Sequence, residues 1–242
     1  MELTSLASVR QAANAILAMN TPLDVLIHNA GMASDTPQDT EDGIEQLFEI
    51  MLYAPFLLSR LLLPLLQQSQ HGGRIVHVSS SLSLRAITMP SQVPVTAQEY
   101  LDRMPHPNSN QFPAGKEMEL YAVVKRYQNR LTLAFQRHLS EDCKDTRVSV
   151  VSVCPGFIPT TQLTQHAPWL MRSVVLRVLS WTPITQTISE GVAQLVEAAQ
   201  DRQHQAEMLR KHVWYPMEES QHDCDLVWHQ CCSVTQVSLN LD

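Results

Sequence analysis

Tyr121 and Lys125 lie four positions apart and carry side chains that together could move a proton. On a helix, side chains at positions i and i+4 share one face, so the phenol would stand beside the ammonium group. A phenol has an ordinary pKa of about 10, and a nearby cation favours the phenolate and lowers that pKa. Such a pair can give a proton to, or take one from, a carbonyl or alcohol oxygen.

The sequence around this pair predicts a helix over residues 120–139. Apolar side chains recur there at a spacing close to 3.6 residues, with polar side chains between them, at Val124, Tyr127, Leu131, Ala134 and Phe135. A tyrosine and a lysine at this spacing also occur by chance in many helices, where both simply face solvent. The chemical interpretation therefore depends on which other residues the fold brings to the pair.

Three stretches rich in branched apolar residues predict strands that would position the pair: Leu23–Ile27, Arg74–Ser79 and Arg147–Cys154. Because long helical patterns separate them, they predict a parallel sheet covered on both faces. Ligands of such sheets bind beyond the carboxyl ends of the strands. The residues expected at those ends are Asn29, Ser80 and Pro155-Gly156.

Residues 4–19 predict a short amphipathic helix, and residues 40–68 predict a long apolar one. A proline inside a helix removes a backbone hydrogen bond, so we expect a bend near Pro55 and an end or second bend near Pro64. Arg60 interrupts the apolar run of this helix. We therefore interpret it as a buried core helix and not as a membrane span.

The composition is that of a folded globular chain, with 44% hydrophobic and 17% charged residues among 242. The length suits one domain, or at most two. A formal net charge of −7 and the lack of any lysine or arginine run argue against a nucleic-acid partner. The five cysteines are odd in number and mostly late in the chain, so they indicate a reducing, cytoplasmic compartment and no disulfide framework.

Residues 82–119 contain five prolines and predict a long loop insertion with one short helix near Gln98–Met104. Helical patterns follow at Trp169–Leu179 and Ser189–Ala199, and residues 200–242 form a C-terminal extension. The late histidines and cysteines, which are His222, Cys224, His229, Cys231 and Cys232, match no zinc-binding spacing, so no metal site is predicted.

Four motifs occur in an order that resembles the short-chain dehydrogenase/reductase family. They are Asn29-Ala30-Gly31, Val78-Ser79-Ser80, Tyr121-x-x-x-Lys125 and Pro155-Gly156-Phe157-Ile158-Pro159-Thr160. The resemblance covers about residues 2–200, and features of the C-terminal part look most like the retinol-dehydrogenase and WW-oxidoreductase branch. It implies one α/β domain over residues 1–242, built on a doubly wound parallel sheet like that of the Rossmann fold.

In this family, Tyr121 would be the proton donor to a substrate carbonyl, and Lys125 would lower its pKa and bond the nicotinamide ribose. Ser80 would hold the substrate oxygen, in preference to Ser79 or Ser81. The resemblance implies NAD or NADP as cofactor. Its adenosine side would meet Asn29, and its carboxamide would be lined by Pro155, Gly156, Ile158 and Thr160.

One departure from the family pattern lies in the long helix before Ser80. The family carries an asparagine there that helps hold a water-linked proton relay, and Met51 stands at the matching position. A thioether cannot donate a hydrogen bond. Turnover should be impaired if such a relay matters in this chain.

A second departure concerns the start of the domain. The family opens with two βα units and a glycine-rich phosphate loop, but Glu2-Leu3-Thr4 aligns with the residues that follow its third strand. At about 30 residues for each βαβ unit, on the order of 70 residues would be absent. We therefore expect a truncated member with a partial Rossmann-like sheet that lacks the first βαβαβ portion.

Two functions remain open on this basis. One is an NAD(P)-dependent oxidoreductase that interconverts a carbonyl and an alcohol on a small lipophilic substrate, such as a retinoid or steroid. The other is a catalytically impaired truncated isoform that binds a full-length homologue. For the second, the helices at 40–68 and 120–139 are candidate surfaces for a homo- or hetero-oligomer.

Overall fold

Five strands form one sheet in the order β1-β2-β3-β4-β5. The computed structural model describes residues 1–34, 36–85, 92–103, 116–141, 147–156, 158 and 186–241. The strands are β1 (Val25–His28), β2 (Arg74–Val78), β3 (Ser149–Cys154), β4 (Glu207–Arg210) and β5 (Val213–Pro216). The first four are parallel and β5 is antiparallel. The predicted α/β class and its three parallel strands are thus confirmed, whereas β4 and β5 were not predicted.

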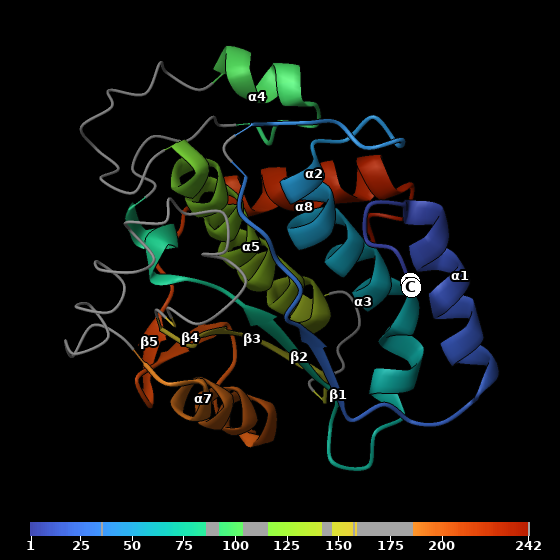
Figure 1. The fold of residues 1–242 in the computed structure, drawn as a ribbon. Coiled ribbons are helices and arrows are strands. Elements are labelled where there is room, and N and C mark those ends of the chain that lie inside the picture. Colours follow the sequence, from blue (N-terminus) through green and yellow to red (C-terminus); the bar gives the residue numbers. More distant parts are fainter. Residues whose placement is uncertain are drawn as a thin grey trace.

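Helices cover both faces of this sheet, as Figure 1 shows. One face carries α1 (Leu6–Ala18), α3 (Ala54–Gln67), α5 (Lys116–Glu141) and α8 (Gln221–Thr235), and the other carries α7 (Ile188–Gln200). The larger part of the apolar core lies between β2, β3 and the helices α3, α5 and α8. A smaller cluster fills the space between the sheet and α7.

The predicted long helix begins at α2 (Gln46–Phe48), widens into a π-helical turn at Glu49–Tyr53 and continues as α3. In a regular α-helix, the carbonyl of Met51 would accept a bond from residue 55, but Pro55 has no N–H to donate. The chain therefore departs from α geometry before Pro55, where a bend was expected. Pro64, in contrast, lies inside α3 and does not end it.

By length and composition, Gln46–Gln67 could cross a membrane, but 78% of its most apolar window is buried inside the protein. This burial matches a core helix. The short helix expected in the proline-rich segment is present as α4 (Ala97–Arg103). Trp169–Leu179 and Met104 lie outside the described residues. Across the described part of the chain, no group of histidine, cysteine or acidic side chains is arranged to hold a metal ion.

Helix α8 packs against α3 and α5, and Trp228 makes the central contacts. The indole ring meets Phe56 of α3 edge-on at 5.2 Å and Phe135 of α5 at 5.4 Å, and it stacks on His138 at 4.1 Å. Its Nε1 donates to the carbonyl of Leu239 at 3.0 Å. The two long helices that the sequence suggested as an oligomer surface are therefore covered here by the chain's own C-terminal helix.

Ion pairs fix the same helix along α5. Glu219, just before α8, accepts from Arg126 and Arg130 at 2.8 Å each, and Asp223 pairs with Arg130 at 2.9 Å. Arg130 and Glu219 are nearly buried, so these bonds are sheltered from solvent screening. They set the position of α8 along α5.

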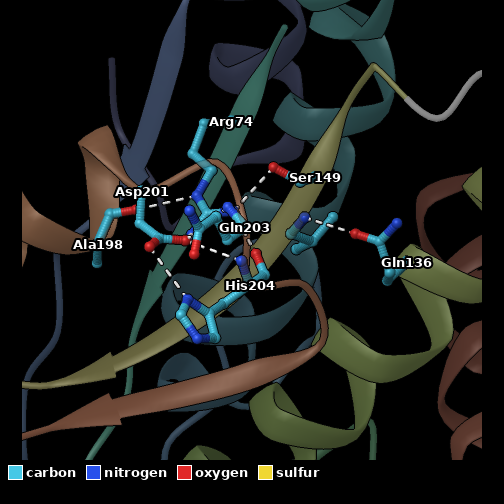
Figure 2. A network of polar contacts seen from close by, with 8 residues as sticks. Arg74, Gln136, Ser149, Ala198, Asp201, Gln203 and His204 are labelled. Atoms are coloured by element: carbon cyan, nitrogen blue, oxygen red, sulfur yellow. Dashed lines mark hydrogen bonds and ion pairs between the residues drawn. The ribbon is translucent and has the colours of Figure 1, made fainter. Parts of the chain in front are cut away.

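At the amino-terminal edge of the sheet, Arg74 holds three elements together (Figure 2). Its buried guanidinium donates to the carbonyl of Ala198 at 2.9 Å, to Ser149 Oγ at 2.9 Å and to the carbonyl of His204 at 2.6 Å. Asp201 lies 3.7 Å away and supplies the opposing charge. Burial lowers the pKa of Arg74 to about 10, so the guanidinium stays charged at neutral pH.

Trp228→Ala should lower the free energy of unfolding by about 3–5 kcal/mol, because it removes a large side chain from between two helices and leaves a cavity. Urea unfolding followed by circular dichroism measures the change. His229→Ala, at an exposed position on the same helix, is the control and should change stability by no more than about 0.5 kcal/mol. Equal stabilities of the two variants would show that α8 is not anchored by its tryptophan.

Arg74→Met should lower the free energy of unfolding by about 3–5 kcal/mol, because it leaves buried carbonyl acceptors without their donor. Methionine keeps much of the aliphatic stem, so the loss reports the guanidinium. Arg202→Met removes an exposed guanidinium nearby and serves as the control. A loss below about 1 kcal/mol for Arg74→Met would contradict a structural role for this cluster.

Candidate active site

Ser80 and Tyr121 meet at the carboxyl end of the sheet. Ser80 follows β2, Tyr121 lies in the first half of α5, and their hydroxyl groups are hydrogen-bonded. The neighbouring serines differ: Ser79 is buried and donates to Asn129 Oδ1 at 2.7 Å, and Ser81 is exposed. Of the three serines, Ser80 is thus the one bonded to the tyrosine.

Lys125 lies one helical turn beyond Tyr121 and is 2% exposed. Its Nζ donates to the carbonyl of Val78 at 2.6 Å and to Gln128 Oε1 at 3.2 Å. It lies 5.6 Å from the centre of the Tyr121 ring. The structure therefore brings together the predicted trio, with the ammonium beside the ring and bonded to neutral oxygens.

The pKa values of the pair differ from the sequence-based expectation. Burial raises the pKa of Tyr121 well above its ordinary 10, and Cys154 adds to this rise, while the hydrogen bond from Ser80 lowers it. Burial also lowers the pKa of Lys125 to about 7. The expected fall in the tyrosine pKa is not seen, because removal from water dominates and the ammonium bonds Val78 and Gln128.

Beneath this trio, a chain of buried polar groups runs between α5 and the sheet. Asn129 Oδ1 accepts from Ser79 at 2.7 Å and from Ser152 at 3.3 Å, and Asn129 Nδ2 donates to Ser83 at 3.0 Å. Ser83 in turn donates to the carbonyl of Ser80 at 2.6 Å. Asn129 thus fixes the chain on both sides of Ser80.

Two buried histidines continue the network toward β1. His77 Nδ1 lies 2.8 Å from Thr132 Oγ1, and His28 Nε2 lies 2.7 Å from Ser59 Oγ. Their rings stack with centres 5.2 Å apart. Burial lowers the pKa of His28 to about 3 and that of His77 well below its ordinary value, so both rings are neutral at neutral pH.

The predicted cofactor residues lie around the same edge. Asn29 is exposed just after β1. At Gly31, an added Cβ would lie 3.2 Å from Met51 Sδ and 3.8 Å from Lys125 Nζ, so glycine keeps the backbone close to both. This places the loop after β1 against the lysine.

Pro155, Gly156 and Ile158 lie between β3 and α7. Gly156 has a positive φ of 83°, which favours glycine, and an added Cβ there would meet Gln186 Oε1 at 2.5 Å. Gly191 of α7 packs against Pro155 and Ile158 in the same way. Thr160 lies outside the described residues.

Comparison with known proteins agrees with the four motifs. The family model for short chain dehydrogenases matches residues 1–92. Polyprenol dehydrogenase from Mus musculus is 32% identical over 199 residues, which cover 82% of this chain and 54% of that protein. Dehydrogenase/reductase SDR family member 13 from Bos taurus is 31% identical over 206 residues, covering 81% of this chain and 49% of that protein.

The chain belongs to the short-chain dehydrogenase/reductase family. A solved structure agrees with this fold: NADPH-bound carbonyl reductase from chicken fatty liver has a TM-score of 0.58 at 19% sequence identity, over 87% of this chain and 73% of that one. The chain spans about half the length of the curated relatives it matches. The retinol-dehydrogenase and WW-oxidoreductase branch and the absence of a first βαβαβ portion stay predictions.

Three residues of the candidate site were not predicted from the sequence, although each has a recognisable sequence feature. Gln128 lies three positions after Lys125 and therefore on a neighbouring part of the same helix face. Asn129 is a polar residue within the apolar pattern of α5. Cys154 ends the strand before Pro155, and the carboxyl ends of parallel strands meet at one edge.

His28→Gln should make the free energy of unfolding less dependent on pH below about 6.5. A histidine with a lowered pKa in the fold binds its proton mainly in the unfolded chain. Its contribution to stability is therefore complete above about pH 6.5 and is lost as the pH falls toward 3, by about 1.4 kcal/mol for each pH unit.

Urea unfolding of wild type and variant between about pH 4 and pH 7 measures this slope. His222→Gln, at an exposed position on α8, is the control and should keep the wild-type slope. Identical slopes for wild type and His28→Gln would mean that His28 is not held neutral in the fold.

Proposed function

We propose that this chain carries the catalytic part of an NAD(P)-dependent oxidoreductase that interconverts a carbonyl and an alcohol. The observation that supports this most directly is the hydrogen bond between the hydroxyls of Ser80 and Tyr121, with Lys125 on the next turn of α5. All three lie beyond the carboxyl ends of β2 and β3, where ligands of parallel sheets bind. Membership of the family agrees with this chemistry.

Proton transfer falls to Tyr121 in this proposal. Its phenol is the acid that gives a proton to the developing alkoxide of a carbonyl substrate, and Ser80 donates a hydrogen bond to the same oxygen. Burial of Tyr121 excludes water from the transfer and keeps the phenol protonated, which is the form that can act as an acid. The roles of the two hydroxyls are complementary because one moves a proton and the other fixes the oxygen.

The residues on the nicotinamide side fit a cofactor. Lys125 has three N–H donors, and two of them are engaged by Val78 and Gln128. No residue of the described part accepts from the third, which would bond a ribose hydroxyl, and Gly31 keeps the backbone close to the lysine without a side chain in between. Pro155, Gly156 and Ile158 would line the carboxamide, and Asn29 would meet the adenosine side. When bound, NAD or NADP supplies or accepts the hydride.

The proposed substrate is a small lipophilic carbonyl or alcohol, of the retinoid or steroid type. One relative is named polyprenol dehydrogenase, and a polyprenol is a lipid-like alcohol. Three apolar side chains of the described part are exposed on α7, at Ile188, Val192 and Val196. The proposed compartment is cytoplasmic.

A second candidate function is that of a catalytically impaired isoform that binds a full-length homologue. The observation that favours it is the outer edge of β1, an edge strand of the described sheet on which Ile27 is 40% exposed. An exposed edge strand presents backbone groups that can pair with another chain. Because α8 covers α3 and α5, a partner would meet this edge and not the long helices.

Cofactor binding separates the two functions. The purified 242-residue chain is titrated with NADPH and with NADH, and the fluorescence of the reduced nicotinamide is measured. Saturable binding of either nucleotide supports the enzyme. Light scattering of the same sample gives its mass in solution. A stable oligomer that binds neither nucleotide would support the interaction partner and contradict the enzyme.

Tyr121→Phe should reduce NADPH-dependent reduction of lipophilic aldehydes and ketones by about 10²-fold to 10⁴-fold, because it removes the acid that protonates the product oxygen. All-trans-retinal is a suitable first probe, with consumption of NADPH measured by absorbance. Cofactor affinity and the unfolding midpoint should stay close to those of the wild type.

Tyr127→Phe is the matched control, because it removes a buried hydroxyl from the same helix at a place outside the site, where it donates to the carbonyl of Gln92 at 3.4 Å. Its turnover should match the wild type. Turnover in Tyr121→Phe close to that of Tyr127→Phe would refute the assignment of Tyr121 as the acid.

A further inference from the structure

Pro55, at the start of α3, removes a backbone donor next to the π-helical turn. In a regular helix the carbonyl of Met51 would accept from the N–H of residue 55, and that residue is proline. Met51 is fully buried, so water does not replace the missing donor freely. A donor from another element is therefore favourable at this carbonyl, because a buried carbonyl that loses its helical donor is destabilising.

Gln128 of α5 supplies that donor. Its side-chain Nε2 donates to the carbonyl of Met51 at 3.0 Å, and its Oε1 accepts from Lys125 Nζ at 3.2 Å. The amide is 1% exposed, so neither bond competes with solvent. One side chain thus connects the π-turn directly to the ammonium beside Tyr121.

The two bonds also fix which way the amide points. A carbonyl can only accept and an ammonium can only donate, so Oε1 must face Lys125 and Nε2 must face Met51. Rotation by half a turn would break both bonds. The acceptor offered to Lys125 is therefore held in one place by the backbone of another helix.

We propose that Gln128 is a positioning residue of the oxidoreductase site, which holds the Lys125 ammonium toward its ligand through a direct bridge to the Met51 carbonyl. This inference rests on the proposed function. Met51 contributes to the site through its backbone carbonyl, which accepts from Gln128, and not through its side chain. A hydrogen bond from an asparagine side chain at this position is then not required.

The electrostatic surroundings of Lys125 show why one acceptor matters. The titratable groups that face it are Tyr121 on its own helix, Cys154 on β3 and His77 on β2. Buried His77 is neutral at neutral pH, and the raised pKa of Tyr121 keeps its phenol neutral. Among the described residues, the Val78 carbonyl and the Gln128 amide are thus the hydrogen-bond acceptors of the buried cation.

The test follows the titration of Lys125 itself. Lysine is labelled at Cε with an NMR-active isotope, and the four lysines of the chain give few signals. The signal that disappears in Lys125→Arg is that of Lys125. Gln128→Met keeps the shape and removes the acceptor, so the pKa of Lys125 should fall by about one to two units from its wild-type value. Gln128→Glu places a negative charge against the ammonium and should raise that pKa by at least about one unit.

Gln136→Met is the matched control. Gln136 is also a buried glutamine of α5, and its Oε1 accepts from the backbone N–H of Val150 at 2.7 Å, far from the site along the helix. Its loss should destabilise the fold while leaving the Lys125 titration at the wild-type value. If Gln128→Met does not fold, Gln128→Glu tests the same bridge with a polar side chain of similar size.

Two readouts keep this inference separate from the proposed function. The isotope titration needs neither cofactor nor substrate, so a chain that binds no NADPH can still show the shifts and support the bridge. In an active chain, the pH dependence of NADPH-dependent retinal reduction should move downward in Gln128→Met and upward in Gln128→Glu. A Lys125 pKa that is the same in wild type and both Gln128 variants would overturn the inference, whatever the activity.

Discussion

The buried ammonium of Lys125 is the constraint around which this structure is organised. A charge removed from water is destabilising unless fixed dipoles replace its hydration. Here those dipoles come from the last residue of β2 and from a glutamine of α5 that is itself tied to the π-turn. A small shift of any of these elements would leave the cation without a partner. Its burial therefore demands an accurate relative placement of strand, turn and helix.

The amino-terminal and carboxyl-terminal ends of the strands differ in the groups that they hold. The amino-terminal ends of the strands hold a permanent charge, Arg74, whose Nε and Nη1 donate to backbone carbonyls and Ser149. The carboxyl edge holds Tyr121 and Lys125, whose protons can move and which retain hydrogen-bonding capacity for a ligand. No chemistry is proposed for the Arg74 cluster, and α8 packs against α5 through Trp228 and the ion pairs of Glu219.

Much of this arrangement could be predicted from the sequence, because the strands and α5 have strong periodic patterns and the four motifs fall at their ends. The strand that carries Glu207–Arg210 was not predicted, since four residues with two charged ends show no clear alternation. The role of Gln128 was not predicted, because it depends on a carbonyl of a helix that is distant in the sequence. No local pattern shows which carbonyl loses its donor at Pro55. The packing of Trp228 against Phe56 and Phe135 was not predicted for the same reason, because long-range contacts decide it.

The opposite shifts of the two pKa values have a consequence for the direction of the proposed reaction. A neutral phenol can donate a proton to a carbonyl, so the site without ligand is already in the state that reduction requires. Oxidation of an alcohol needs Tyr121 as a base, and the phenolate becomes favourable only when Lys125 is charged beside it. Any bound group that accepts a hydrogen bond from Lys125 stabilises its ammonium form and so favours the phenolate as well. Ligand binding at the lysine and the proton on the tyrosine are therefore coupled, and Gln128, by orienting that ammonium, influences both.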